Sequence, residues 1–252
     1  MKRLAYLGCL LLSACIGTVR LDAVHLGGAP AKLAGAVKAG LTINGQLQVT
    51  LDAWGRISAG TGGLALTSKG ATDVPGLITN VFERGIAPGD PVDLVFVVDT
   101  TGSMGDDIDA VKADMQRILR ELTARNPDRR IGVVAYRDRG DSYVSRTMLA
   151  ISADDAQIRR AIDSLSVGGG GDLREHVYAG IDTALVEQPC RPGASQHIIL
   201  MGDAPPHDDY SDDPRNFHAV IARASAAPLA VRIHTIGLKC DTLCQALIVA
   251  GA

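Results

Sequence analysis

The sequence predicts an α/β fold with a doubly wound, mostly parallel sheet and one antiparallel edge strand, a Rossmann-like arrangement. The first observation is a set of short apolar runs typical of a sheet covered on both faces: residues 92–98, 131–136, 197–201 and 231–238. The second is that segments with helical periodicity separate most of these runs, as in βαβ units. The third is the polar link at 137–142, which is so short that residues 143–149 can only pair antiparallel with residues 131–136.

Apolar residues at spacings of three and four predict the helices that cover this sheet. Ser152 with Asp155 indicates a capping box for the second helix, and Asp213 ahead of Pro214 indicates a cap for the fourth. Asp106 and Asp107 fall in the first turn of the first helix, where the helix dipole favours them. The apolar faces carry Ile108, Val111, Met115, Ile118 and Leu122; Ile158, Ile162 and Leu165; Val177, Ile181 and Leu185; and Phe217, Val220 and Ile221.

The chain divides into three expected parts: an export signal at 1–14, a Gly- and Ala-rich spacer with a few weak strands at 15–90, and one domain at 91–252. The signal has a charged start, Lys2 and Arg3, before the apolar run 4–12. Residues 12–15, Leu-Ser-Ala-Cys, resemble the bacterial lipobox, and this resemblance makes Cys15 a lipid anchor. An ordinary cleaved signal with an incidental cysteine is the alternative.

Composition excludes several classes of function. The chain has 252 residues, 46% hydrophobic content and a formal charge of −3 with no basic stripe, which argues against a nucleic-acid surface. The glycines at 60–63 lack the strand and helix context of a dinucleotide fingerprint, and those at 168–171 lack the Gly-Lys-Ser/Thr of a P-loop. No nucleotide ligand is therefore expected.

Cysteine usage points to one bridge. Cys240 and Cys244 are one helical turn apart, whereas Cys190 belongs near the opposite end of the sheet. In an oxidising compartment we therefore expect the disulfide to join Cys240 to Cys244.

Polar side chains at the ends of predicted strands predict a metal site. Asp99, Thr101 and Ser103 directly follow the run 92–98, and Asp203 follows the run 197–201. The carboxyl ends of strands in a doubly wound sheet are where ligands bind. Carboxylate and hydroxyl oxygens without His or thiolate suit Mg²⁺, or Mn²⁺ or Ca²⁺. The bland alternative is that Asp99 and its neighbours only cap a helix.

This D-x-[ST]-x-S spacing, combined with Asp203, resembles the metal-ion-dependent adhesion site (MIDAS) of von Willebrand factor type A domains. The resemblance covers roughly residues 91–238 and includes the segments Asp-Thr-Thr-Gly-Ser-Met-Gly, Val-Ala-Tyr-Arg-Asp, Gly-Gly-Gly-Gly-Asp and Gly-Asp-Ala-Pro-Pro-His. It implies that Ser103 and Thr101 are hydroxyl ligands and that Asp99 and Asp203 bind directly or through water. Family members usually continue with a helix, an edge strand and a final helix, which residues 239–252 are too few to form.

The middle loop departs from the family pattern. The nearest bacterial pattern reads Gly-Gly-Asp-x-Pro-Glu, whereas this chain has Arg174 in place of the proline. Asp172 is the expected ligand, with Glu175 as the alternative. Arg137 and Arg139 are expected to be surface charges, and the acidic stretch 207–213 a solvated loop.

The function that follows is a non-catalytic adhesion or assembly module of the bacterial cell envelope, anchored by lipid in the outer membrane or facing the periplasm. Its ion would bind an acidic side chain of a protein partner. A metal-assisted hydrolase is one alternative, with His207 or Glu175 as the base. A regulatory subunit of an ATPase or chelatase is another, although an export signal argues against it.

Overall fold

The structure is a computed structural model that describes residues 52–171, 174–208, 210–226 and 230–238. The expected signal at 1–14, the anchor Cys15, the loop ligand Asp172 and the pair Cys240 and Cys244 lie outside the described residues.

The described residues form one six-stranded sheet in the order β1-β6-β5-β2-β3-β4. All neighbours are parallel except β3 and β4, which are antiparallel. The predicted fold class is therefore confirmed, including the antiparallel edge that follows from the short link after residue 136. The strands are β1 (Ala65–Thr67), β2 (Val92–Asp99), β3 (Arg129–Tyr136), β4 (Ser145–Ser152), β5 (Ser195–Gly202) and β6 (Val231–Gly237).

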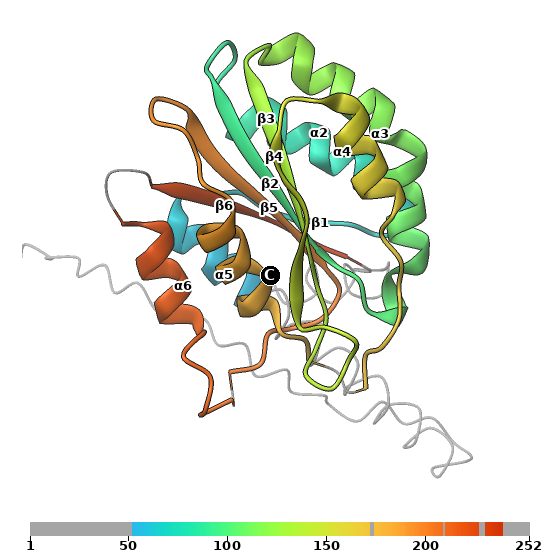
Figure 1. Cartoon of the computed structure of the whole chain (residues 1–252), viewed down its shortest axis with the longest axis vertical. Helices are drawn as coiled ribbons and strands as arrows, with labels where there is room; N and C mark the ends of the chain where they lie inside the picture. Colours follow the sequence, from blue (N-terminus) through green and yellow to red (C-terminus); the bar gives the residue numbers. More distant parts are fainter. Residues whose placement is uncertain (1–51, 172–173, 209, 227–229, 239–252) are drawn as a thin grey trace, which may run out of the picture.

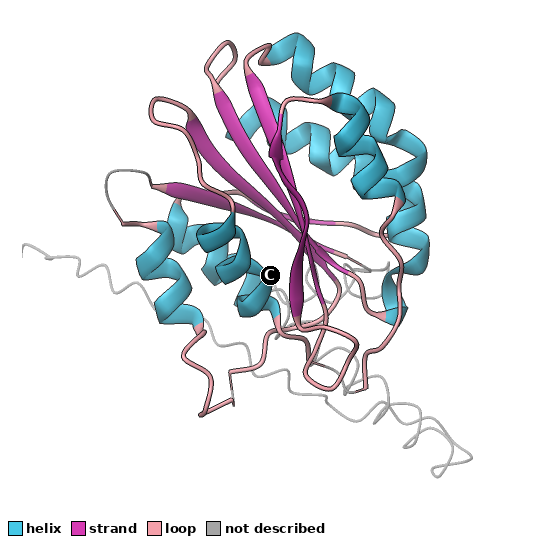
Figure 2. Cartoon of the chain, in the orientation of Figure 1, coloured by secondary structure: helices cyan, strands magenta, loops and turns pink. Residues whose placement is uncertain are grey.

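Helices cover both faces of the sheet (Figures 1 and 2). On one face lie α2 (Val74–Gly85), α3 (Gly105–Arg125) and α4 (Asp155–Asp163). On the other lie α5 (Val177–Glu187), α6 (Phe217–Ala224) and a helix over residues 52–61. Alternate residues of β2 enter the two cores, Leu94 and Phe96 on the α3 side and Val95 and Val97 on the α5 side. This is the alternation of a strand buried on both faces.

Residues 52–90 are part of this fold. The expectation that they form a separate spacer is therefore wrong. Trp54 and Ile57 of the 52–61 helix enter the core on the α5 side, and α2 enters the core on the α3 side. Between them, β1 pairs parallel with β6. Position 63, just before β1, requires glycine, because a Cβ atom there would lie 2.0 Å from the carbonyl oxygen of Ile233.

Residues 52–85 therefore supply a helix, a strand and a helix beside β6. The sequence pattern of this part of the fold is weak, because β1 has only three residues and its neighbours are rich in glycine. A short edge strand carries too few alternations to be read from the sequence.

Candidate metal centre

The candidate site lies at the carboxyl ends of two adjacent strands, β2 and β5. Asp99 is the last residue of β2, and Asp203 directly follows β5. Because these strands are parallel, with Val98 opposite Met201, their ends meet at one edge of the sheet. The fold thus brings together two carboxylates that are 104 positions apart in sequence numbering (203 − 99).

Asp99 organises the loop that follows it. Its Oδ1 accepts hydrogen bonds from the backbone N–H of Thr101 at 2.9 Å and from the Thr101 hydroxyl at 2.7 Å. Both residues are buried, whereas Ser103 is exposed. The hydroxyl oxygens of Thr101 and Ser103 are 3.4 Å apart. A row of oxygens therefore leads from the end of β2 to the surface.

Ser103 closes the row by donating a hydrogen bond to Oδ1 of Asp203 at 3.0 Å. The structure thus joins Asp99, Thr101, Ser103 and Asp203 in one network of two carboxylates and two hydroxyls. Such oxygen donors fit a hard divalent cation. The part of the chain that the structure describes contains no group of three or more His, Cys, Asp or Glu side chains placed to hold a metal, so a site here depends on the hydroxyls.

The glycine loop packs directly on this row. The N–H of Gly168 donates to the carbonyl of Thr100 at 3.0 Å, and the N–H of Gly102 donates to the carbonyl of Gly169 at 3.3 Å. Gly170 has φ +80°, and a Cβ atom there would lie 3.3 Å from both Thr101 and Glu175. Glycine is needed where the backbone is left-handed and its neighbours are this close.

Of the two middle-loop candidates, the described residues include only Glu175. It is 4% exposed, and its Oε1 lies as close to the Cβ position of Gly170 as the Thr101 side chain does, 3.3 Å in each case. The backbone of Glu175 is bonded to the loop after Asp203 through Pro205 and His207. Glu175 therefore belongs to the site region, next to the loops of Thr101 and Asp203.

Tyr136 and Gly202 are site residues that the sequence did not single out. The phenol of Tyr136 is fully buried, and its pKa is well above the usual value because of burial and of the nearby carboxylates of Asp99, Glu175 and Asp203. A Cβ atom at Gly202 would lie 2.4 Å from this phenol oxygen. A neutral tyrosine therefore lies beneath the carboxylates, and only glycine leaves it room. The Val-Ala-Tyr-Arg-Asp segment was the available signal.

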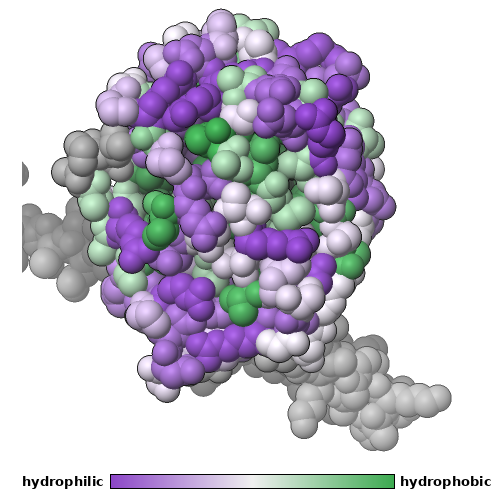
Figure 3. Space-filling view, viewed as in Figure 1, coloured by the Kyte–Doolittle hydropathy of each residue, from purple (hydrophilic) through white to green (hydrophobic). Residues whose placement is uncertain are grey.

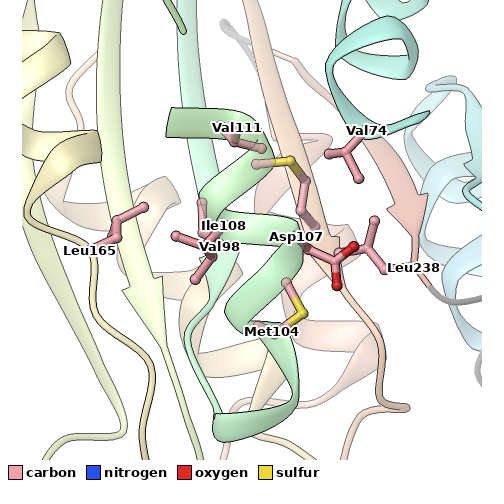
Figure 4. Close-up of a pocket in the computed structure, with 9 residues that line it drawn as sticks. Val74, Val98, Met104, Asp107, Ile108, Val111, Leu165 and Leu238 are labelled. Atoms are coloured by element: carbon pink, nitrogen blue, oxygen red, sulfur yellow. The ribbon is translucent and has the colours of Figure 1, made fainter. Parts of the chain in front are cut away.

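Asp107 lies in the first turn of α3, as predicted, and is 1% exposed. Its carboxylate lies among the apolar side chains of Val74, Met104 and Leu238 (Figure 4). The positive end of the helix dipole favours a negative charge in this turn.

The expectation that Arg137 is a surface charge is wrong. Arg137 is 8% exposed, and its guanidinium donates to the carbonyl of Ser166 at 2.7 Å and to the hydroxyl of Ser142 at 2.9 Å. It also lies over the ring of Tyr143, 4.6 Å from the centroid. Arg137 therefore connects the β3–β4 link, through Ser142, to Ser166, just before the glycine loop.

The acidic stretch 207–213 is solvated only in part: Asp208 and Asp212 are exposed, whereas His207 and Asp213 are buried. The polar contacts that hold it, centred on Tyr210, are called the clasp. Tyr210 lies between the imidazole of His207, with ring centroids 4.1 Å apart, and the guanidinium of Arg139, 3.9 Å from the ring centroid. The Tyr210 hydroxyl donates to Asp138 at 3.0 Å. The loop after β5 is thereby bound to the loop after β3.

Asp213 is the second fixed point of this clasp. Hydrogen bonds from Arg215 and Arg139 hold the pKa of its carboxyl far below the usual range. The same carboxylate contacts Nε2 of His176 at 2.8 Å, while burial lowers the pKa of that imidazole. Asp212 and Asp213 are both paired with Arg139, so the negative charge of these two residues is partly compensated.

Comparison with known proteins finds a matching family model and several similar sequences. A family model described as von Willebrand factor A domain matches residues 93–230. Alpha-protein kinase vwkA of Dictyostelium discoideum is 29% identical over 126 residues, which cover 49% of this chain and 20% of that protein. Von Willebrand factor A domain-containing protein 7 of Rattus norvegicus is 31% identical over 119 residues, which cover 46% of this chain and 12% of the relative.

Solved structures with a similar fold include bacterial proteins. The protein BatB from Bacteroides thetaiotaomicron aligns with a TM-score of 0.44 and 18% identity, covering 58% of this chain and 66% of that one. Three N-terminal domains of the type V pili tip protein Mfa5 from Porphyromonas gingivalis align with a TM-score of 0.37 and 26% identity, covering 45% of this chain and 20% of that one.

Proposed function

Because this chain belongs to the von Willebrand factor A domain family, we propose that it is a non-catalytic adhesion or assembly module that holds a protein partner through a divalent cation. Asp99, Thr101, Ser103 and Asp203 would hold Mg²⁺, or Mn²⁺ or Ca²⁺. The ion would supply a positively charged coordination position for an acidic side chain of the partner. Glu175 is an additional candidate ligand from the middle loop.

The observation that carries the proposal is the continuous row of oxygens from Asp99 through Thr101 and Ser103 to Asp203. A helix cap needs only one of these side chains, whereas this row joins two loops. Two of its members are hydroxyls, which coordinate without neutralising the ion. An ion held directly by the hydroxyls, with Asp99 and Asp203 bound through water, would keep charge with which to attract a carboxylate.

The surface supports recognition through polar contacts. Among the described residues, the exposed large hydrophobic side chains are Val167 and Val186, and the face in Figure 3 is mainly hydrophilic with small, separated apolar spots. Broad apolar patches mark many protein interfaces. A surface of this kind suits a partner that is held by a charged contact.

The cell-envelope location and the lipid anchor at Cys15 belong to the proposal and are supported by the sequence alone. Within the described ranges, no helix combines the length and apolar composition needed to cross a bilayer. Radiolabelled fatty acid incorporated into the wild type but not into Cys15→Ser would test the anchor.

The ion is tested by thermal unfolding in EDTA and then with Mg²⁺ or Mn²⁺. A ligand bound only by the folded state raises its stability by RT ln(1 + [L]/Kd), so a tenfold increase in ion above saturation adds about 1.4 kcal/mol. Thr101→Val removes the hydroxyl and keeps the shape, whereas Thr101→Ser keeps the hydroxyl. We expect the ion-dependent rise in Tm to disappear in the first variant and persist in the second.

Equal rises in Tm with the ion in both Thr101 variants would show that the Thr101 hydroxyl is not a ligand of the ion. No response in a cooperatively folding wild type would refute the proposal. The partner is tested separately: binding of envelope proteins should require the ion, end on addition of EDTA, and be lost when the carboxylates of those proteins have been converted to amides. Binding that survives amidation would contradict recognition through an acidic side chain.

A further inference from the structure

Tyr136 carries a buried hydroxyl that the packing of the sheet does not need. The side chain is fully buried, and within the residues that the structure describes its hydroxyl oxygen has no hydrogen-bond partner of good geometry. A buried polar group without such a partner costs free energy, and phenylalanine would fill the same space without that cost. The hydroxyl therefore points to a role beyond packing.

The strands place this hydroxyl beside the carboxylate of Asp99. Asp99 and Tyr136 end the neighbouring parallel strands β2 and β3 and are partners in the register. Tyr136 packs with Val95 and Val97 in the core on the α5 side. Asp99 continues the alternation of Val95 and Val97 along β2, so its side chain belongs to the same face of the sheet.

Gly202, the last residue of β5, gives the phenol room to extend across β2. A Cβ atom at position 202 would lie 2.4 Å from the Tyr136 hydroxyl and 3.0 Å from Cβ of Asp99. The hydroxyl and the Asp99 side chain therefore border the same small space, which the missing side chain of Gly202 leaves open. The phenol thus reaches from the end of β3 past Asp99 to the end of β5.

The charged groups around this hydroxyl are hydrogen-bond acceptors. Burial and the nearby carboxylates of Asp99, Glu175 and Asp203 raise the pKa of the phenol well above its usual value, so it keeps its proton. Asp99 also acts on the phenol as a hydrogen-bond acceptor, although their contact lacks the geometry of a full hydrogen bond. A protonated phenol beside a carboxylate donates to it.

Asp99 is the carboxylate on which the loop after β2 depends. Its Oδ1 accepts the N–H and the hydroxyl of Thr101, at 2.9 and 2.7 Å. These two bonds hold one oxygen from the loop side. A donor from the Tyr136 side would hold the carboxylate from below and fix its rotation. Hydrogen bonds of this kind orient the ligands of metal ions and tune their affinity.

We propose that Tyr136 is a positioning residue of the candidate metal centre, whose hydroxyl donates to Asp99 and holds this carboxylate in the orientation that binds the ion. This role rests on the metal centre proposed above and gives the phenol no contact with the ion. Because the bond is not fully formed in the ion-free arrangement, it should tighten when the ion binds. The hydroxyl should therefore matter for ion affinity and not for the stability of the ion-free protein.

Tyr136→Phe tests this role, and Tyr143→Phe is the matched control. The Tyr143 hydroxyl lies 2.6 Å from Oγ1 of Thr100, in the same loop as the expected ligands, but its partner is a hydroxyl instead of a carboxylate. The full chain is titrated with Mn²⁺, and electron paramagnetic resonance of the free ion gives the dissociation constant. Tyr136→Phe should raise this constant about tenfold or more, the usual effect of losing a group that orients a ligand, whereas Tyr143→Phe should leave it unchanged.

Two further readouts separate positioning from packing. In EDTA, Tyr136→Phe should have the Tm of the wild type or a higher one, because it removes a hydroxyl that lacks a full hydrogen bond. Tyr143→Phe should have a lower Tm, because it removes a formed hydrogen bond. Saturating Mg²⁺ should also shift the near-ultraviolet absorption of tyrosine in the wild type and in Tyr143→Phe, but not in Tyr136→Phe.

The outcomes distinguish this role from the metal centre itself. An unchanged dissociation constant in Tyr136→Phe, with a wild type that binds Mn²⁺, would overturn the role of Tyr136 and leave the metal centre in place. Equal losses of affinity in both tyrosine variants, or a Tm of Tyr136→Phe in EDTA below that of Tyr143→Phe, would also overturn it, because the hydroxyl would then support the fold. A folded wild type that binds no Mn²⁺ would refute the metal centre and, with it, the role of Tyr136.

Discussion

The hydroxyl of Ser103 donates a hydrogen bond of 3.0 Å to Oδ1 of Asp203 and so joins two loops that are 100 residues apart in the chain. Asp99 is at the start of the first loop, and the buried Tyr136 lies below both. Since neither loop is part of a strand, this contact helps to set their separation at the surface. The ion affinity and the stability of the ion-free protein should both depend on it.

A double-mutant cycle with Ser103→Ala and Asp203→Asn measures this contact. In EDTA, each single change should lower the free energy of unfolding, and the two effects should couple by about 1 kcal/mol, the usual net contribution of one hydrogen bond. Urea unfolding gives these values. Strictly additive effects would mean that the two side chains do not interact in solution.

Gly202 should tolerate no side chain. A Cβ atom there would lie 2.4 Å from the Tyr136 hydroxyl and 2.9 Å from the ring of Trp54. Gly202→Ala should therefore destabilise the protein by about 1–3 kcal/mol, the typical cost of overpacking. Adding Tyr136→Phe, which removes the nearest atom, should recover part of that loss. Failure of the second change to recover any stability would place the clash elsewhere.

The helix over residues 52–61 should be essential for folding and for the metal loop. Trp54 is 1% exposed, and its Nε1 donates to the carbonyl of Ala204, next to Asp203, at 3.1 Å. Trp54→Ala should cost about 3–5 kcal/mol, as for other buried aromatic residues, whereas Ala59→Ser at an exposed position of the same helix should cost little. Thermal unfolding measures both.

A shortened chain that begins at residue 91 provides the complementary test. It would lose β1 and α2 as well as Trp54, and we expect it to show no cooperative transition. Normal folding of this fragment would contradict the assignment of residues 52–85 to the domain.

The sheet from β2 to β6 could be predicted because its strands are long apolar runs and its helices have clear periodicity. Helix starts were less accurate, since several Asp, Ser and Asn residues compete at each end. Asp154 caps α4 in place of Ser152, and Asn216 caps α6 in place of Asp213. Each capping side chain accepts N–H bonds from the first turn, and only the backbone geometry decides which one does so.

The clasp around Tyr210 could not be predicted, because its contacts join loops that are far apart in sequence. The sequence shows Arg139 and Asp213 only as charges, and charges are usually exposed. Burial of Asp213 becomes tolerable when Arg215, Arg139 and His176 surround it. Such compensation is a property of the fold and not of any local motif.

Asp213 should make stability fall in acid. Its folded-state pKa is below the unfolded value, so its stabilising contribution is present at neutral pH and is lost as the pH drops below about 4. Asp213→Asn should lose about 2 kcal/mol at pH 7, in the range of hydrogen bonds to charged groups, and much less at pH 3. Urea unfolding at the two values compares them. A loss that stays constant with pH would show that the carboxylate is not held in its charged form.

The buried side chains of His197 and His234 should remain neutral at mildly acidic pH, where a solvent-exposed histidine is protonated. The folded-state pKa values of His197, about 3, and His234, about 4, lie below the usual value of 6.5. Their contribution to stability is complete above pH 6.5 and declines as the pH falls toward 4, because only the unfolded chain takes up the protons. Nitrogen-15 NMR at pH 5.5 should show neutral rings with the proton on Nε2 of both residues, and the exposed ring of His218 serves as an internal reference. The backbone N–H of Leu64 donates to Nδ1 of His234 at 3.1 Å, which leaves the proton of His234 on Nε2, 3.0 Å from Nδ1 of His197. A proton on Nδ1 of His197 would contradict this direction of the hydrogen bond.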